Sequence, residues 1–197
     1  MKIPSKVIEL SEPDEQEIID ISSIAFFGAP QIPALINKPK YTKIIVANLF
    51  SLYKGTGKTR SFGIKKDDKL VCVGFCIDSD LKPRFIKKIK FGFLLLRTLG
   101  FKGVRQFLKC DKNKPKYNKT CLELVLYGTL PSYQKKGFGR QMLNFLYDFA
   151  KKNNYGGVTG VTNSIRPAFK FYMGDGWIVD KEFYVENYRL CWVRRIV

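Results

Sequence analysis

The chain has 197 residues, of which 45% are hydrophobic, and a formal net charge of +18 at pH 7. This length fits one domain with a core of its own, and the apolar content argues against global disorder. The absence of histidine excludes Ser-His-Asp and Cys-His catalysis and nearly all common zinc sites, so we expect no metal. The five cysteines form no Cys-x-x-Cys pair, and no apolar stretch typical of a secretory signal begins the chain. We therefore expect reduced thiols and a cytoplasmic protein.

Hydrophobic periodicity predicts five elements in the first eighty residues. They are a strand at 6–10, a helix from 13 to about 27, a helix at 40–53, and a hairpin of strands at 60–64 and 70–77. Ser11 is the expected N-cap of the first helix, since serine is favoured there and acidic residues follow in the first turns.

The next segment, from Lys82 to Lys119, is strongly basic. It contains thirteen lysines and arginines against a single acidic residue, Asp111, and so carries +12 of the net charge. Its apolar residues recur at helical spacing and predict two amphipathic helices broken near Gly100. We call residues 82–119 the basic segment and expect it to be a helical insertion.

The remainder of the chain alternates between strands and helices. The predicted elements are a buried central strand at 120–128, a helix at 137–153, a strand at 157–162, a short helix at 167–173, and strands at 177–185 and 188–196. The mixture predicts an α/β (α+β) fold.

The turn between the central strand and the long helix reads Gln134-Lys135-Lys136-Gly137-Phe138-Gly139-Arg140. A glycine-rich turn that enters a helix leaves several backbone N–H groups unpaired and pointing one way, and the helix dipole adds to their field. Gly137 and Gly139 have no Cβ, so the backbone can approach a phosphate closely. Lys135, Lys136 and Arg140 add positive charge. We expect a pyrophosphate-bearing ligand here; the alternative is a tight loop without a ligand.

Two motifs in this half resemble a known family. The spacing Gln-x-x-Gly-x-Gly after a strand and Pro131 resembles motif A of the GNAT superfamily of N-acetyltransferases. Ala168-Phe169-Lys170-Phe171-Tyr172, followed by Gly176-Trp177, resembles motif B of the same family. The resemblance is good over 120–197 and looser over 6–77. It implies a single GNAT domain over 1–197, with a mixed, mostly antiparallel sheet of six to seven strands that is flanked by helices and splayed at the central strand. Some bacterial members resemble this chain in carrying a helical pair before the central strand.

The resemblance implies acetyl-CoA as cosubstrate, with its acetyl group passing to a primary amine by direct attack in a ternary complex. In the family, the turn at 134–140 holds the pyrophosphate, and the strand before it aligns the pantetheine arm. The matching strand residues here are Tyr127, Gly128, Thr129 and Leu130. A splay beside Gly128 would expose an N–H to the thioester carbonyl. Ile165 occupies the position of a frequent family asparagine, so Asn163, two residues earlier, is the candidate for that contact with CoA.

Two side chains are candidates for proton transfer. Tyr172 matches the family tyrosine that protonates the CoA thiolate; the alternative is a tyrosine that only packs on its helix. Glu123, eleven residues before Gln134, resembles the catalytic glutamate of the histone-acetylating branch. A carboxylate among apolar residues has a raised pKa, which suits a general base. The alternative is that Glu123 forms a salt bridge to a lysine. Ordered water would then carry the proton of the amine instead.

The basic segment has three interpretations: a lid over the acceptor site, a face that binds nucleic acid or a membrane surface, or a core-packed helix pair with solvated lysines. We favour the lid, because the segment enters the central strand beside Glu123. Its field disfavours polycationic acceptors, so we expect a small-molecule or peptide amine that also carries carboxylate or phosphate. The alternative function is a non-catalytic protein that binds CoA or polyanions. The sequence leaves the oligomeric state open.

Overall fold

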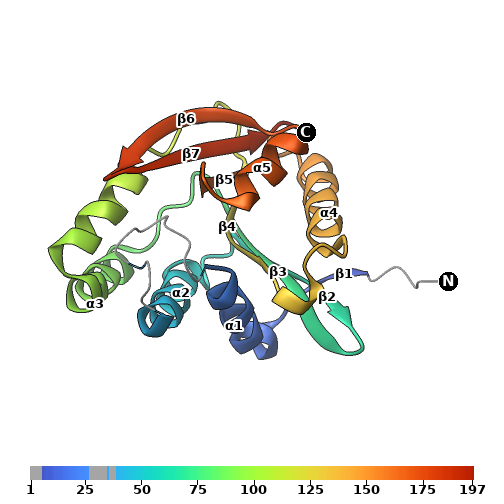
Figure 1. Cartoon of the computed structure of the whole chain (residues 1–197), viewed down its shortest axis with the longest axis horizontal. Helices are drawn as coiled ribbons and strands as arrows, with labels where there is room; N and C mark the ends of the chain where they lie inside the picture. The colour runs from blue at the N-terminus through green and yellow to red at the C-terminus, as the bar shows by residue number, and fades with distance from the viewer. Residues whose placement is uncertain (1–5, 27–34, 36–38) are drawn as a thin grey trace.

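The computed structural model describes residues 6–26, 35 and 39–197. Within these residues a seven-stranded sheet has the order β1-β2-β3-β4-β5-β7-β6 (Figure 1). The strands are β1 Val7–Glu9, β2 Thr59–Lys66, β3 Lys69–Asp78, β4 Leu122–Thr129, β5 Val158–Asn163, β6 Ile178–Val185 and β7 Tyr188–Arg195. Neighbouring strands are antiparallel except β4 and β5, which are parallel. The mostly antiparallel sheet predicted from the sequence is confirmed.

Helices occur in the described residues wherever hydrophobic spacing predicts them. They are α1 Glu15–Phe26, α2 Pro39–Tyr53, α3 Phe85–Lys112, α4 Phe138–Lys152 and α5 Pro167–Gly174, with short 3-10 helices η1 Glu12–Asp14 and η3 Pro131–Tyr133. Before α1, the Ser11 backbone N–H donates to the Asp14 carboxylate at 2.9 Å, so the capped turn is η1 and the α-helix proper begins after it. The predicted end of this helix, at residue 27, lies outside the described residues.

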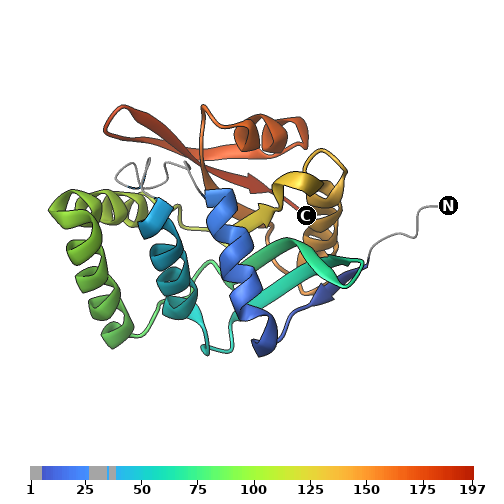
Figure 2. The ribbon, with the colours of Figure 1, turned by 60° about the horizontal axis from the view of Figure 1, so that its bottom comes forward.

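The sheet separates two apolar cores. Side chains alternate between the two faces of a strand, so on β3 Cys72 and Cys76 face one core while Val73 and Phe75 face the other. The first core is closed by α4, through residues such as Met142 and Leu146. The second is closed by α1 and α2, as Figures 1 and 2 show. Because both faces are covered, β3 is an almost continuous apolar run.

The basic segment forms α3, which is bent at Gly100 (Figure 2). Gly100 has φ 68°, a left-handed backbone conformation that glycine adopts at little cost, so the predicted break is confirmed. The first arm packs Phe91, Leu95 and Leu99 against α2. The end of the second arm reaches β6 and β7, where Cys110 contacts a cluster around Trp192. Among the described residues, no helix is long and apolar enough to cross a membrane.

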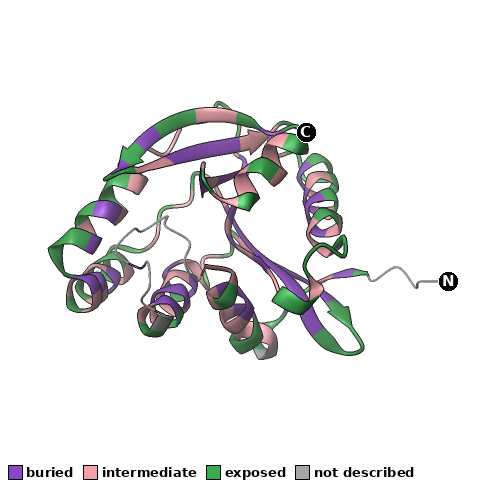
Figure 3. Cartoon of the chain, viewed as in Figure 1, coloured by how far each residue is buried: buried purple, intermediate pink, exposed green. Residues whose placement is uncertain are grey.

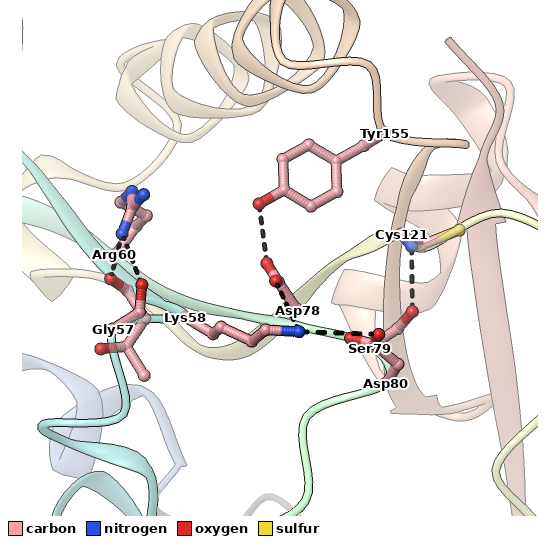
Figure 4. A network of polar contacts seen from close by, with 9 residues as sticks. Gly57, Lys58, Arg60, Asp78, Ser79, Asp80, Cys121 and Tyr155 are labelled. Carbon is pink, nitrogen blue, oxygen red and sulfur yellow. Dashed lines mark hydrogen bonds and ion pairs between the residues drawn. The ribbon is translucent and has the colours of Figure 1, made fainter.

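The two ends of the α3 connection are held together at the edge of the β3–β4 pair. The Ser79 backbone N–H donates to the Cys121 carbonyl, and the Cys121 N–H donates to Ser79 Oγ, each at 2.9 Å (Figure 4). Beside them Asp78 accepts a hydrogen bond from the Tyr155 hydroxyl at 2.7 Å, and Lys58 Nζ lies 3.8 Å from a carboxylate oxygen of Asp78 (Figure 4). The connection therefore leaves and rejoins the sheet at one fixed point, next to Glu123.

Candidate active site

The parallel strands β4 and β5 diverge immediately after Glu123. They are paired only at Leu122 with Val158 and Glu123 with Thr159, whereas β4 stays paired with β3 as far as Thr129. Two small cavities, of about 90 and 110 Å³, lie at the divergence and share Leu124, Val125 and Val161 in their walls. The predicted splay is present, and it gives access to β4 from two sides.

A β-bulge on β4 lies at the point where the two cavities meet. Leu126 pairs with Phe75 and Leu124 with Cys76, so Val125 between them has no partner on β3. A bulge leaves backbone groups outside the ladder. The family resemblance implied an exposed N–H beside Gly128, whereas the irregularity in the structure lies three residues earlier, at Val125.

Gly128 itself has a packing explanation. It is paired with Val73, and a Cβ built on it would lie 2.6 Å from the Ala25 Cβ. The missing side chain therefore lets α1 approach β4 closely.

The turn before α4 has the geometry of an anion site. Gly137 is the N-cap of α4 with φ 90°, and no atom of the described residues lies within 4 Å of a Cβ built on it. None of the backbone N–H groups from Lys135 to Arg140 donates a hydrogen bond within the described residues. The Gln134 side chain instead ties the turn to the sheet, donating to the Thr129 carbonyl at 3.1 Å. The turn thus presents a row of free donors at a positive helix end.

The basic side chains of the turn are not equivalent. Arg140 Nε lies 3.7 Å from Asp175 Oδ1, so its charge is partly matched within the protein. Lys136 lies over the Tyr133 ring, 5.2 Å from its centroid. Neither Lys135 nor Lys136 has a carboxylate partner within the described residues. These two lysines, beside the partly exposed Phe138, are therefore the cations of the turn whose charge is not matched by a carboxylate in the described residues.

Gly139 faces the protein rather than open space. A Cβ built on it would lie 2.6 Å from the hydroxyl of Tyr127, the β4 residue that the sequence analysis assigned to the pantetheine site. The expected reason for this glycine was a close approach to phosphate. The structure gives a further one, the contact between α4 and β4.

Gly139→Ala is expected to destabilise the fold by about 1–3 kcal/mol, because the added methyl overlaps the Tyr127 hydroxyl. Removing that hydroxyl with Tyr127→Phe in the same chain should restore part of the loss, as measured by urea unfolding. Gly92→Ala is the matched control, since nothing in the described part of the chain lies within 4 Å of its Cβ position. That change should stabilise the helix by about 0.5–1 kcal/mol. Equal effects of the two alanines would contradict the contact.

The smaller cavity, of about 90 Å³, holds the candidates at the α5 side of the splay. Tyr127, Asn163, Arg166 and Tyr172 line it. Asn163 is buried, and its Oδ1 accepts from the Ile165 N–H at 3.0 Å, while its Nδ2 has no acceptor within the described residues. A buried amide donor without a partner is uncommon and fits a ligand carbonyl. Burial raises the pKa of Tyr172, so its hydroxyl stays protonated; its ring packs 4.6 Å from that of Trp177.

The cavity of about 110 Å³ holds Glu123, which is 8% exposed. Its carboxylate forms an ion pair with Lys114, which follows α3. Burial raises the pKa of Glu123, and the Lys114 ammonium partly offsets that rise. A salt bridge was one alternative for Glu123, and its partner comes from the basic segment.

The basic segment forms much of this second wall. Phe107, Cys110, Asp111 and Lys114 line the cavity with Glu123. A larger cavity of about 690 Å³ adjoins it and shares Tyr53, Phe107, Asp111 and Lys114. Apolar residues of both arms of α3 line this larger space, with Lys82, Lys88 and Lys116 also in its wall. The larger cavity and the cavity that holds Glu123 therefore share a wall to which α3 contributes.

Three contributors were not singled out from the sequence. The bulge at Val125 could not be predicted from the sequence, because a bulge depends on how the strand is paired with β3. Lys114 is one of thirteen similar basic residues in its segment. Arg166 stands immediately before the helix of motif B, and this position is the only indication the sequence offers.

Comparisons with known proteins agree with this geometry. A profile of the acetyltransferase (GNAT) family matches residues 37–175. No curated protein sequence matches the chain. Solved structures share the fold at low identity: a histone acetyltransferase HPA2 and related acetyltransferase from Corynebacterium glutamicum (16% identity, 99% of this chain and 98% of that one, TM-score 0.62), the C-terminal condensation domain of Ebony in complex with beta-alanyl-dopamine (15%, 100% of both, 0.67) and Arabidopsis thaliana Naa50 in complex with a CoA-Ac-MVNAL bisubstrate analogue (13%, 99% and 100%, 0.57). Since the family profile spans well over half of its length, the chain belongs to the GNAT acetyltransferase family.

Proposed function

We propose that this protein is an acetyl-CoA-dependent N-acetyltransferase that acts on a primary amine by direct attack in a ternary complex. The observation that carries the proposal is the β4–β5 divergence, where a cavity on each side meets at the Val125 bulge. Two substrates can reach β4 from opposite sides there, as a transfer without a covalent intermediate on the protein requires.

The α4 side suits acetyl-CoA. Free N–H groups from Lys135 to Arg140 would bind its pyrophosphate, with Lys135 and Lys136 adding charge. The β4 backbone from Tyr127 to Leu130 would align the pantetheine arm, and the free Asn163 Nδ2 would bind one of its carbonyls. The relative from Arabidopsis was solved with a CoA bisubstrate analogue, which supports the same ligand class here. When bound, acetyl-CoA supplies the activated thioester.

Three groups of the chain would then share the chemistry. Glu123 takes the proton of the attacking amine, directly or through water. The backbone at the Val125 bulge donates to the oxygen on which negative charge develops. The thiolate that leaves when the carbon–sulfur bond breaks receives its proton from the Tyr172 hydroxyl.

The chain would form a single domain over 1–197. The acceptor would enter that domain along the basic segment. The larger cavity combines apolar walls from Phe91, Leu95 and Phe107 with Lys82 and Lys88. This combination favours a small-molecule or peptide amine with an apolar body and a carboxylate or phosphate, and it disfavours polyamines. A screen of such amines, following release of free CoA thiol, tests the activity. Preference for polyamines would contradict this acceptor class.

Acetyl-CoA should raise the Tm by about 5–10 °C at a hundredfold excess over its Kd, because it binds only the native state. Gly137→Asp should abolish that rise, since it places a carboxylate where phosphate is expected. Gly57→Asp is the matched control: Gly57 also has a left-handed backbone and open space around it, but lies far from α4 in the sequence. A rise that survives Gly137→Asp would contradict the assignment of the turn.

The Tm measurement and the CoA-thiol assay together distinguish the enzyme from the non-catalytic alternative. It predicts the Tm rise with acetyl-CoA but no release of CoA thiol with any amine acceptor.

A further inference from the structure

The first arm of α3 has two apolar faces, and only one of them is covered. Phe91, Leu95 and Leu99 are buried against α2. Phe85, Ile86, Ile89 and Phe93 lie on another side of the same helix and are exposed, Phe85 at 76% and Phe93 at 69%. Their spacing, i, i+1, i+4 and i+8, gathers them into one stripe. We call these four residues the outer face.

Basic side chains border the outer face. By helical spacing, Lys90 and Arg97 lie along one edge, and both are exposed. Neither of them, nor Arg84 at the start of the arm, has a carboxylate partner within the described residues. Exposed residues recur along both arms of α3 (Figure 3). A contiguous exposed apolar stripe bordered by unpaired cations is not needed to fold the helix, which is already held through its buried side.

We propose that the outer face binds the surface of an anionic lipid membrane, with the arm lying in the plane of the interface. The four apolar side chains would enter the boundary between head groups and acyl chains, and the lysines and arginines would meet lipid phosphate. Nucleic acid explains the charge but not the stripe, because isoleucine and phenylalanine exposed in a row gain nothing from a phosphate backbone. A neutral protein groove explains the stripe but leaves the positive charges beside it, Lys90 and Arg97, without a complement.

This surface is separate from the acceptor route. The larger cavity is lined by Lys88, Phe91, Gly92 and Leu95 of the same arm, while none of the four outer-face residues lines it. Membrane attachment and acetyl transfer therefore involve different sides of one helix. The two proposals can fail independently.

Sedimentation with vesicles tests the inference on the full chain. We expect binding to vesicles of equal parts phosphatidylglycerol and phosphatidylcholine, but not to pure phosphatidylcholine, and loss of binding at high salt. Phe85→Ser with Phe93→Ser should lower the partition coefficient about ten- to a hundredfold, because two rings that would enter the membrane are lost. Lys90→Gln with Arg97→Gln should lower it about tenfold and flatten the salt dependence.

The matched control is Ile178→Ser with Tyr184→Ser on β6, which removes two other exposed apolar side chains and should leave vesicle binding unchanged. All variants should keep the far-UV circular dichroism spectrum and the cooperative thermal unfolding of the wild type, which shows that they are folded whether or not acetyl-CoA binds. As an independent reading, Phe93→Trp should give fluorescence that shifts to shorter wavelength on anionic vesicles.

Equal partitioning of the wild type and the Phe85/Phe93 variant would overturn the proposal. So would tight DNA binding that ignores these substitutions, or a dimer that the same substitutions dissociate while no vesicle binding is seen.

Discussion

Replacing Tyr172 with phenylalanine is expected to lower turnover by about two to four orders of magnitude, the usual contribution of a general acid. The ring that packs 4.6 Å from Trp177 remains, so the Tm and its rise with acetyl-CoA should change little. Turnover is measured as release of CoA thiol with an amine that the wild type acetylates. Because burial raises the pKa of Tyr172, its ionisation should not limit activity below about pH 10.

Tyr133→Phe is the matched control for this change. Tyr133 also lies near the start of α4, where its ring packs 5.9 Å from that of Phe138, but it does not line the cavity with Asn163. Loss of its hydroxyl should leave turnover unchanged. If Tyr172→Phe behaves like Tyr133→Phe, Tyr172 is a packing residue and the thiolate is protonated from elsewhere.

The fold was predictable where it depends on local pattern. The period of α4 follows from Met142, Leu143, Leu146 and Ala150, all buried in the structure. The apolar run at 70–77 indicated a strand, and the structure shows that both of its faces are covered. Gly100 indicated the bend of α3, because glycine is disfavoured in helix interiors. In the structure this glycine has a left-handed backbone, as a break in the helix requires.

The candidate site was less predictable, because it depends on register and on contacts between distant segments. The bulge at Val125 arises from pairing with β3, fifty residues earlier in the chain. The contact between Gly139 and the Tyr127 hydroxyl joins a strand to the following helix. Lys114 pairs with Glu123 only because the α3 connection returns to the sheet at that point. The spacing of residues along the sequence does not predict such contacts between distant segments.

The outer face of α3 shows a further limit. Helical spacing in the sequence predicted an apolar face that contains Phe85 and Phe93, but in the structure both are exposed, and Phe91 and Leu95 are buried instead. Only the packing of α2 distinguishes the buried pair from the exposed pair. Amphipathic pattern predicts that a helix has an apolar side, but not which partner covers it.

Glu123→Gln is expected to lower kcat/KM by about two to four orders of magnitude, because the amide accepts no proton from the acceptor amine. In the wild type, kcat/KM should rise with pH as the Glu123 carboxyl ionises. Burial raises the pKa of this carboxyl and Lys114 lowers it. Removing the ammonium with Lys114→Met therefore raises the pKa of Glu123 further, and the acidic limb of the pH profile should move to higher pH.

Stability must be separated from catalysis in this test, since breaking a buried ion pair leaves one charge uncompensated and costs about 3–5 kcal/mol. The double variant Glu123→Gln with Lys114→Met removes both charges and should recover much of the Tm lost in each single variant. It should remain as inactive as Glu123→Gln if the carboxylate is the base. Lys112→Met, an exposed lysine without a carboxylate partner in the described residues, should shift neither the pH profile nor the Tm. Activity that returns with stability in the double variant would mean that Glu123 serves only to hold Lys114 in place, and that ordered water carries the proton.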